Sequence, residues 1–331
     1  MDADTVRPLI RAGERSAAER AVARWWATRR FRAEAFPLDR LRECKHGRDT
    51  TVIIPVRECS QTIAAVLDRT LAPALHAGLV DELVVVDAGS SDGTADVAAA
   101  HGARVIQQDA VASELGPALG KGDAMWRALA ATDGEIVCFL DGDTLDPAPS
   151  HLLGLLGPLL VDDSLGFVKG AFERPFDTGR ERLAHEGGRV TELMARPLIN
   201  LHAPLLAGFA QPLAGEFAGR RDLLEQIPFP VGYGVEIATL LDALAMCGLD
   251  GLAECHLGTR QNRHQSLRAL GEMAYEVLAA FELRVDTAHG RPPASGRFVR
   301  PWEGEVPVEL PVLERPPLRD HAAARRTASG G

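Results

Sequence analysis

The chain has 331 residues, of which 46% are hydrophobic and 25% charged, and its formal net charge is -10 at pH 7. This composition is typical of a globular protein, and the acidic balance argues against a broad nucleic-acid-binding surface. No stretch approaches the ~18 consecutive apolar residues of a membrane span. The start Met1-Asp-Ala-Asp4 lacks the basic and apolar regions of a signal peptide, so we expect a cytoplasmic protein.

The predicted elements begin with an N-terminal helical arm at residues 1–48. This stretch is rich in Arg, Ala and Glu, and its apolar residues, including Trp25 and Trp26, follow a roughly helical spacing. We expect the two tryptophans to pack against the body of the protein or against a second subunit.

Strands and helices alternate from Thr50 onward. Apolar and partly β-branched runs predict strands at residues 51–56, 82–87, 103–107 and 135–140, with a helix after each of the first three. The alternation predicts an α/β fold with a mostly parallel sheet and right-handed crossovers.

The remainder of the chain is less regular. Residues 151–285 contain one more strand candidate, at 165–169, and several helices. Residues 286–331 are rich in Pro, Arg and Gly, and we expect the end of this extension to be disordered.

The predicted strand at 135–140 ends in Asp141-Gly-Asp143, which is the most informative motif of the chain. Open α/β folds bind their ligands where strands leave the sheet. Carboxylates one residue apart can share a hard cation, and Mg²⁺ commonly binds one or two carboxylates together with substrate phosphates. A capped turn without a metal is the alternative, and the motif by itself does not decide between them.

Two glycine-containing segments add weaker signals. Asp87 ends a predicted strand, so its carboxylate could accept hydrogen bonds from a base or a ribose hydroxyl, or it could cap the turn that follows. Lys121 lies between two glycines at a predicted helix start, which suits phosphate binding. No Walker loop and no G-x-G-x-x-G after the first strand is present, so a nucleotide must be held in another way.

Three later segments combine charged groups with glycines or with potential metal ligands. Gly188-Arg189-Val190-Thr191 could bind an anion, or it could be a flexible loop before a helix. Glu236 could orient a sugar hydroxyl, or simply favour the helix dipole. The stretch 260–264 combines arginines with Asn262 and His264. Taken together, these signals describe a nucleotide-sugar site.

Six motifs between Thr50 and Gly271 carry a resemblance to a known family. They are Gly-Lys-Gly-Asp-Ala-Met-Trp126, Phe-Leu-Asp-Gly-Asp-Thr-Leu-Asp-Pro147, Phe167-Val-Lys-Gly170, Gly-Gly-Arg-Val-Thr-Glu-Leu193, Gln211-Pro-Leu-Ala-Gly-Glu216 and Gly-Tyr-Gly-Val-Glu-Ile237. With them the chain resembles the retaining GT-A-type glycosyltransferases, specifically the glucosyl-3-phosphoglycerate synthases, whose family also contains the mannosyl-3-phosphoglycerate synthases.

The resemblance implies a GT-A fold with a Rossmann-like, mostly parallel sheet. Residues 49–150 would be its nucleotide-sugar-binding half and residues 151–285 its acceptor-binding half. The implied reaction transfers glucose, with UDP-glucose favoured as donor, to the 2-hydroxyl of 3-phosphoglycerate in a Mg²⁺-dependent homodimer, with Mn²⁺ as a possible replacement. A mannosyl enzyme using GDP-mannose, a sugar-phosphate nucleotidyltransferase and a non-catalytic nucleotide-sugar-binding module are the alternatives.

The resemblance also implies a set of site residues. Four would act in catalysis: Asp143, Glu236, Lys121 and Leu213. Those binding the nucleotide sugar would be Pro55, Val56, Glu58, Asp87, Gly89, Ser90, Lys121, Asp141 and Gly142. Those binding the acceptor would be Gly188, Arg189, Val190, Thr191 and Asn262. The metal would be held by Asp143 and His264.

The chain departs from the family pattern in three places. Around Glu58, Arg57 stands where the family usually has Asn and Cys59 where it usually has another acid, and Gly142 stands where Ser is common. Family members place the metal-binding His at the position of Asn262, whereas here His264 occupies a place usually taken by Asn. Either His264 takes over this role through a local shift, or Asp143 acts with water and phosphate alone; we favour His264 as the metal ligand.

Overall fold

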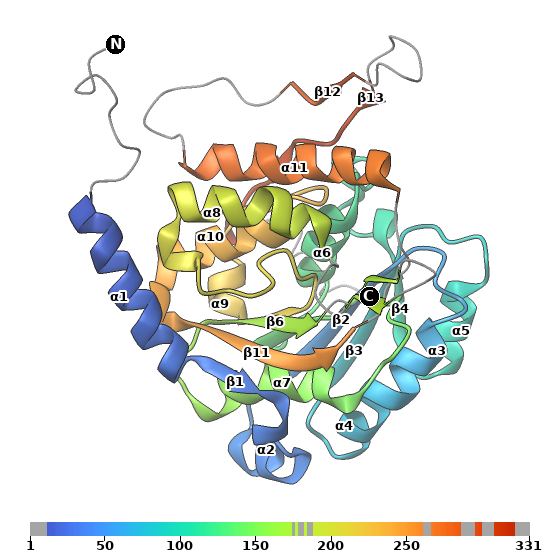
Figure 1. Ribbon diagram of the computed structural model, residues 1–331. Helices are drawn as coiled ribbons and strands as arrows, with labels where there is room; N and C mark the ends of the chain where they lie inside the picture. The colour runs from blue at the N-terminus through green and yellow to red at the C-terminus, as the bar shows by residue number, and fades with distance from the viewer. Residues whose placement is uncertain are drawn as a thin grey trace.

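The computed structural model describes residues 12–173, 176–177, 182–183, 188–260, 266–285, 295–299 and 308–321. Within these residues an eight-stranded sheet has the order β1-β11-β6-β9-β5-β2-β3-β4, with helices on both faces (Figure 1). Neighbouring strands run parallel, except that β9 is antiparallel to both β5 and β6. The predicted α/β fold with a mostly parallel sheet is therefore confirmed.

The strands of this sheet are β1 (Arg30–Arg32), β2 (Thr50–Val56), β3 (Glu82–Asp87), β4 (Arg104–Gln107), β5 (Ile136–Phe139), β6 (Phe167–Glu173), β9 (Phe217–Arg220) and β11 (Leu252–Thr259). Three strand pairs lie outside it: β7 (Phe176–Asp177) with β8 (Arg182–Leu183), β10 (Phe229–Pro230) with β14 (Glu314–Arg315), and β12 (Arg297–Phe298) with β13 (Val308–Glu309).

The α-helices are α1 (Ala12–Thr28), α2 (Leu38–Cys44), α3 (Ile63–Val66), α4 (Ala72–His76), α5 (Thr94–Ala100), α6 (Lys121–Ala130), α7 (Pro149–Val161), α8 (Arg196–His202), α9 (Arg221–Leu224), α10 (Val235–Cys247) and α11 (Leu267–Val285). A π-helical segment (Leu67–Leu71) joins α3 to α4, and another (Thr191–Ala195) precedes α8. None of the helices in the described part of the chain is both long and apolar enough to cross a membrane.

The sheet has a hydrophobic core on each face. Along β2, Ile53 belongs to the core beneath α6 and α10, whereas Val52 and Ile54 belong to the core beneath α3 and α7. Strands covered on both faces read as continuous apolar runs, which is why predicted strands correspond to β2, β3, β5 and β6. The predicted strand at 103–107 corresponds to β4, which is the partly exposed strand at one edge of the sheet. In the predicted arm, Trp25 is buried and packs on Phe209, while Trp26 is 53% exposed.

Three strands of the sheet were not predicted, and they shape the site. β1 lies in the segment expected to be a helical arm and pairs with β11. Because β9 runs antiparallel, with Phe139 opposite Phe217, the residues just before β9 lie at the edge where β5 ends and Asp141 follows. Arg260 follows β11 at this same edge. Sheet topology thus brings three distant stretches of sequence together.

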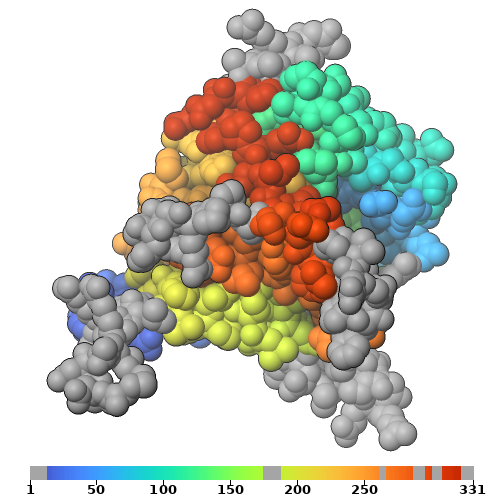
Figure 2. All heavy atoms as spheres, turned by 90° about the horizontal axis from the view of Figure 1, so that it is seen from above, coloured from blue at the N-terminus to red at the C-terminus, as the bar shows by residue number. Residues whose placement is uncertain are grey.

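The segment 308–321 is bound to the helix that carries Lys121. Arg315 forms an ion pair with the buried Asp123 at 2.6 Å, and the Trp126 indole N–H donates to the Pro316 carbonyl at 2.9 Å. Leu318 is fully buried in the core. Figure 2 shows this segment, in red, between the green region containing α6 and the orange helix α11. The predicted disorder of the chain end falls on residues 322–331, which lie outside the described residues.

The two glycines around Lys121 are required by packing. A Cβ at Gly120 would approach the Val231 carbonyl oxygen to 2.8 Å, and one at Gly122 would overlap the Pro230 carbonyl oxygen. The Asp123 N–H donates to the Val231 carbonyl at 3.0 Å. The start of α6 therefore packs directly against the backbone of residues 230–231.

Replacing Gly122 with alanine should lower the free energy of unfolding by ~1–3 kcal/mol, because backbone must shift to admit the methyl group. Urea denaturation measures this loss. Gly13→Ala is the matched control, since Gly13 lies near the start of α1 with nothing within 4 Å of its added Cβ. Equal stabilities of the two variants would contradict the close packing at Gly122.

Candidate active site

A cavity of about 660 Å³ opens at the edge where β2 and β5 end. Volumes of roughly 300–1,000 Å³ are typical of small-molecule sites. The predicted site residues that line the cavity are Pro55, Val56, Lys121, Asp141, Gly142, Asp143, Gly188, Arg189, Val190, Thr191, Leu213 and Glu236. Two predicted residues, Asn262 and His264, lie outside the described residues.

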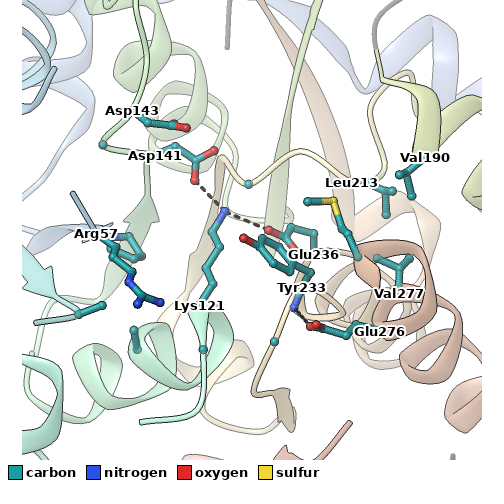
Figure 3. Close-up of a pocket in the computed structure, with 18 of the residues that line it drawn as sticks. Arg57, Lys121, Asp141, Asp143, Val190, Leu213, Tyr233, Glu236, Glu276 and Val277 are labelled. Atoms are coloured by element: carbon teal, nitrogen blue, oxygen red, sulfur yellow. Dashed lines mark hydrogen bonds and ion pairs between the residues drawn. The ribbon is translucent and has the colours of Figure 1, made fainter. Parts of the chain in front are cut away.

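Lys121 lies at the centre of the cavity wall. Its Nζ is 2.7 Å from Asp141 Oδ1 and 3.0 Å from Glu236 Oε1 (Figure 3). Burial disfavours the charge on Lys121, but the two carboxylates outweigh it and raise the pKa of the ammonium above its ordinary value. Lys121 therefore stays protonated. It links Asp141, which follows β5, to Glu236 in the first turn of α10.

Arg260 was noted in the sequence only as one of the arginines of residues 260–264, and no role in the site was assigned to it. Its guanidinium is buried, with Nη2 3.0 Å from Asp141 Oδ2 and 3.5 Å from Asp143 Oδ1, and Nη1 ion-paired with Glu216. Burial acts against the Asp141 charge, yet Lys121 and Arg260 together hold the pKa of Asp141 well below its usual range. Asp141 is therefore an ionised bridge between two cations.

Asp143 is the member of the motif that is open to the cavity. Its side chain is 57% exposed, compared with 18% for Asp141. Within the described residues, no three His, Cys, Asp or Glu side chains gather closely enough to hold a metal ion. An exposed carboxylate in a nucleotide-sized cavity fits Mg²⁺, which takes a single protein carboxylate when substrate phosphates supply other ligands. The chain's own residues therefore fit a divalent cation at Asp143.

Four predicted nucleotide-binding residues, Glu58, Asp87, Gly89 and Ser90, lie outside the cavity lining. Glu58 accepts a hydrogen bond from the Ser91 N–H at 2.8 Å, and its own N–H donates to Ser90 Oγ at 2.9 Å. Asp87 accepts hydrogen bonds from the Ser90 N–H and from Gln107 Nε2. These side chains hold the rim of the cavity together, and their contact with a nucleotide stays a prediction.

Arg57 and Tyr233 line the cavity and were not selected from sequence (Figure 3). Arg57 follows β2, while Tyr233 precedes α10 and faces the Lys121–Glu236 pair. The Tyr233 N–H donates to Glu276 on α11 at 2.7 Å. Burial raises the pKa of Glu276. A glycine-flanked tyrosine was visible in the sequence, but nothing in the local pattern linked it to α11.

The predicted acceptor-binding residues form the opposite side of the cavity. Gly188 has φ +76°, and Arg189 and Val190 begin the helical segment that continues into α8. Leu270, Met273 and Val277 of α11 line the cavity with them. Of the expected acceptor site, the structure thus brings residues 188–191 to the cavity.

Lys169, within the predicted strand 165–169, is fully buried beneath the site. Its Nζ donates to the Glu236 backbone carbonyl at 3.0 Å, and it lies 5.2 Å from the Phe217 ring centroid. Burial is the main cause that lowers the pKa of Lys169 to about 7. A lysine inside an apolar strand indicates a buried polar contact. Here the contact is the hydrogen bond from Lys169 to the Glu236 carbonyl, which fixes the first turn of α10.

Comparisons with known proteins agree with this geometry. Residues 51–227 match the family model of Glycosyl transferase family 2. The glucosyl-3-phosphoglycerate synthase of Mycolicibacterium smegmatis is 43% identical over 77% of this chain and 84% of that protein. The protein of the same name from Mycobacterium tuberculosis H37Rv is 40% identical, over 84% of this chain and 88% of its own length.

Two solved structures share the fold of this chain. The M. tuberculosis glucosyl-3-phosphoglycerate synthase with Mn²⁺, UDP-glucose and phosphoglyceric acid has a TM-score of 0.77 at 38% identity, covering 86% of this chain and 95% of its own. The Rubrobacter xylanophilus mannosyl-3-phosphoglycerate synthase has a TM-score of 0.80 at 41% identity, covering 90% and 99%. The expected GT-A fold is confirmed. The chain belongs to glycosyl transferase family 2 and, within it, to the family of the glucosyl-3-phosphoglycerate synthases.

Proposed function

We propose that the protein is a retaining hexosyltransferase that moves glucose from UDP-glucose to the 2-hydroxyl of 3-phosphoglycerate. The observation that carries the proposal is the cluster of Lys121, Asp141 and Glu236 beside the exposed Asp143 in one cavity. The curated relatives named above are glucosyl-3-phosphoglycerate synthases, and the M. tuberculosis protein binds UDP-glucose and phosphoglyceric acid.

Asp143 would hold a divalent metal together with His264 and the donor diphosphate. Mg²⁺ is favoured, and the M. tuberculosis complex contains Mn²⁺. When bound, such a cation acts as a Lewis acid toward the charge of the departing diphosphate. Lys121 adds a protonated ammonium at the same wall of the cavity, fixed in place before the reaction by Asp141 and Glu236.

The ion pairs of Asp141 and Glu236 argue against either carboxylate acting as a nucleophile at the sugar. Asp141 is ion-paired with Lys121 and Arg260, and Glu236 with Lys121. We propose that Glu236 instead accepts hydrogen bonds from donor-sugar hydroxyls. The acceptor hydroxyl then attacks from the side of the leaving group, whose phosphate takes its proton, and Leu213 lines the reacting face. This front-face route retains the anomeric configuration.

The acceptor would bind opposite the metal. The side chain of Arg189 and the amides of residues 188–191 supply positive charge for the phosphate and carboxylate of 3-phosphoglycerate, and Asn262 completes this site. Both sequence halves, 49–150 and 151–285, line the cavity. We propose that they are the nucleotide-sugar and acceptor halves of one GT-A domain.

A parallel assay tests the proposal. The protein is incubated with Mg²⁺ or Mn²⁺, 3-phosphoglycerate, and either UDP-glucose or GDP-mannose. We expect glucosyl-3-phosphoglycerate from UDP-glucose, with the α-anomer of the donor retained in the NMR spectrum of the product. Product from neither donor would refute the function, product only from GDP-mannose would make the protein a mannosyl enzyme, and an inverted anomer would exclude the front-face route.

The assembly we propose is a cytoplasmic homodimer. Trp26 is 53% exposed, and the Arg30 guanidinium lies 4.2 Å from its ring centroid. An exposed aromatic residue of this kind suits a subunit contact. Light scattering after size-exclusion chromatography measures the mass, and a monomer at micromolar concentration would contradict the proposal.

A further inference from the structure

The loop 210–216 forms one wall of the cavity, against the Lys121–Asp141 pair. Leu213 and Gly215 of this loop line the cavity. A Cβ added at Gly215 would lie 2.5 Å from Lys121 Nζ and 2.6 Å from Asp141 Oδ2, so the loop backbone touches the charged pair with no space between them. We call residues 210–216 the wall loop. Any displacement of this loop changes the shape of the cavity beside Lys121.

The strand β11 and the residue after it hold both ends of the wall loop. At its start, Glu254 accepts hydrogen bonds from the Ala210 N–H at 2.6 Å and the Gln211 N–H at 3.5 Å. At its end, Glu216 is ion-paired with Arg260. The start is held from a second side as well, because Arg196 Nη2 donates to the Ala210 carbonyl at 2.9 Å.

Glu254 is a buried carboxylate that the proposed reaction does not use. Its side chain is 1% exposed, and Arg30 Nε on β1 is its ion-pair partner at 2.9 Å. Burial raises the pKa of Glu254, against the opposing effect of Arg30. A buried ion pair adds little to stability relative to apolar packing of the same volume, since its desolvation is costly. Its contacts with two backbone amides therefore point to a geometric role.

We propose that Glu254, with Arg30 as its counter-cation, is a positioning residue that fixes the wall loop beside the reacting sugar. This rests on the proposed glucosyl transfer. Arg30 belongs to the N-terminal segment, which thereby acts on the reaction through β11 without touching substrate. Loosening the loop should slow transfer, because misplacement of about 1 Å can cost ~10²-fold in rate. It should also admit water to the donor, so that a larger fraction of UDP-glucose is hydrolysed instead of being used for transfer.

The test compares Glu254→Ala and Glu254→Gln with Asp162→Asn. Asp162 pairs with the adjacent Arg29 at 2.5 Å but makes none of the contacts given above for the wall loop. We expect Glu254→Ala to lower kcat for transfer by roughly 10–100-fold, with a smaller change in KM for UDP-glucose and a higher fraction of donor hydrolysed. Glu254→Gln should recover part of kcat, since its amide oxygen still accepts the Ala210 N–H. Asp162→Asn should behave as wild type.

Amide hydrogen exchange tests the same inference independently of turnover. The Glu254 variants should exchange faster at residues 210–216 than wild type and Asp162→Asn, and Glu254→Gln serves if the alanine variant does not fold. Unchanged exchange in this loop, or a hydrolysed fraction equal to that of Asp162→Asn, would overturn the inference. Absence of transfer in the wild type would refute the proposed function instead, while the exchange result would still decide the role of Glu254.

Discussion

Replacing Asp143 with alanine should reduce kcat by about a thousandfold, equivalent to ~4 kcal/mol of transition-state stabilisation. Asp143 is the exposed carboxylate of the Asp-Gly-Asp motif, so its loss removes the proposed metal ligand while leaving the Lys121–Asp141 ion pair intact. The affinity for Mn²⁺, measured by electron paramagnetic resonance in the presence of UDP, should fall together with the activity.

The control for this substitution is Asp96→Ala, which removes an exposed carboxylate from α5, away from the cavity lining. It should retain the wild-type kcat and Mn²⁺ affinity. If Asp143→Ala bound Mn²⁺ and turned over as the wild type does, the assignment of Asp143 as a metal ligand would be wrong. His264→Ala and Asn262→Ala, compared in the same titration, identify the second protein ligand.

Replacing Arg260 with methionine should lower the free energy of unfolding by about 3–5 kcal/mol, because it leaves a buried carboxylate without its cation. The Glu216 side chain is 3% exposed, and the structure pairs it with Arg260. Asp141 loses one of its two cations in the same step. Urea denaturation gives the change in stability, and activity should fall as well.

A double-mutant cycle separates the two effects of Arg260. The variant Arg260→Met/Glu216→Leu should regain most of the lost stability, since no buried charge is left unpaired. It should remain poorly active, because Asp141 and Asp143 still lack the guanidinium. If the double variant were as unstable as the single one, the Glu216–Arg260 pair would not be the source of the loss.

The central strands could be read from sequence because both of their faces are buried. β2 and β3 are apolar runs of six or seven residues, and β3 is followed by a glycine-containing turn, so both could be recognised without knowing their place in the sheet. β11 has Glu254 and His256 within it, so its pattern resembles an interrupted run. The ion pair with Arg30 and the hydrogen bonds from the Ala210 and Gln211 N–H groups compensate the burial of this acid, and all of these partners lie far from Glu254 in sequence.

Site residues could be predicted from the sequence where they follow an apolar strand or stand beside a glycine at the start of a helix. Asp141 and Asp143 follow an apolar strand, and Lys121 and Glu236 begin helices next to glycines, so each was visible as a candidate. Arg260 and Glu216 were visible only as members of longer segments, and their pairing could not be predicted, because they meet through the antiparallel insertion of β9 between β5 and β6. A local sequence pattern does not predict that a later strand inserts between two earlier ones.

The attachment of residues 308–321 to α6 also orders the events of biosynthesis. These residues leave the ribosome after every other described part of the chain, yet Arg315 joins Arg127 in pairing with the buried Asp123 at the start of the helix that carries Lys121. Domains begin to fold from the N-terminus while synthesis continues. A nascent chain can therefore form its sheet early, but it completes the lysine-bearing wall of the cavity only when this late segment emerges.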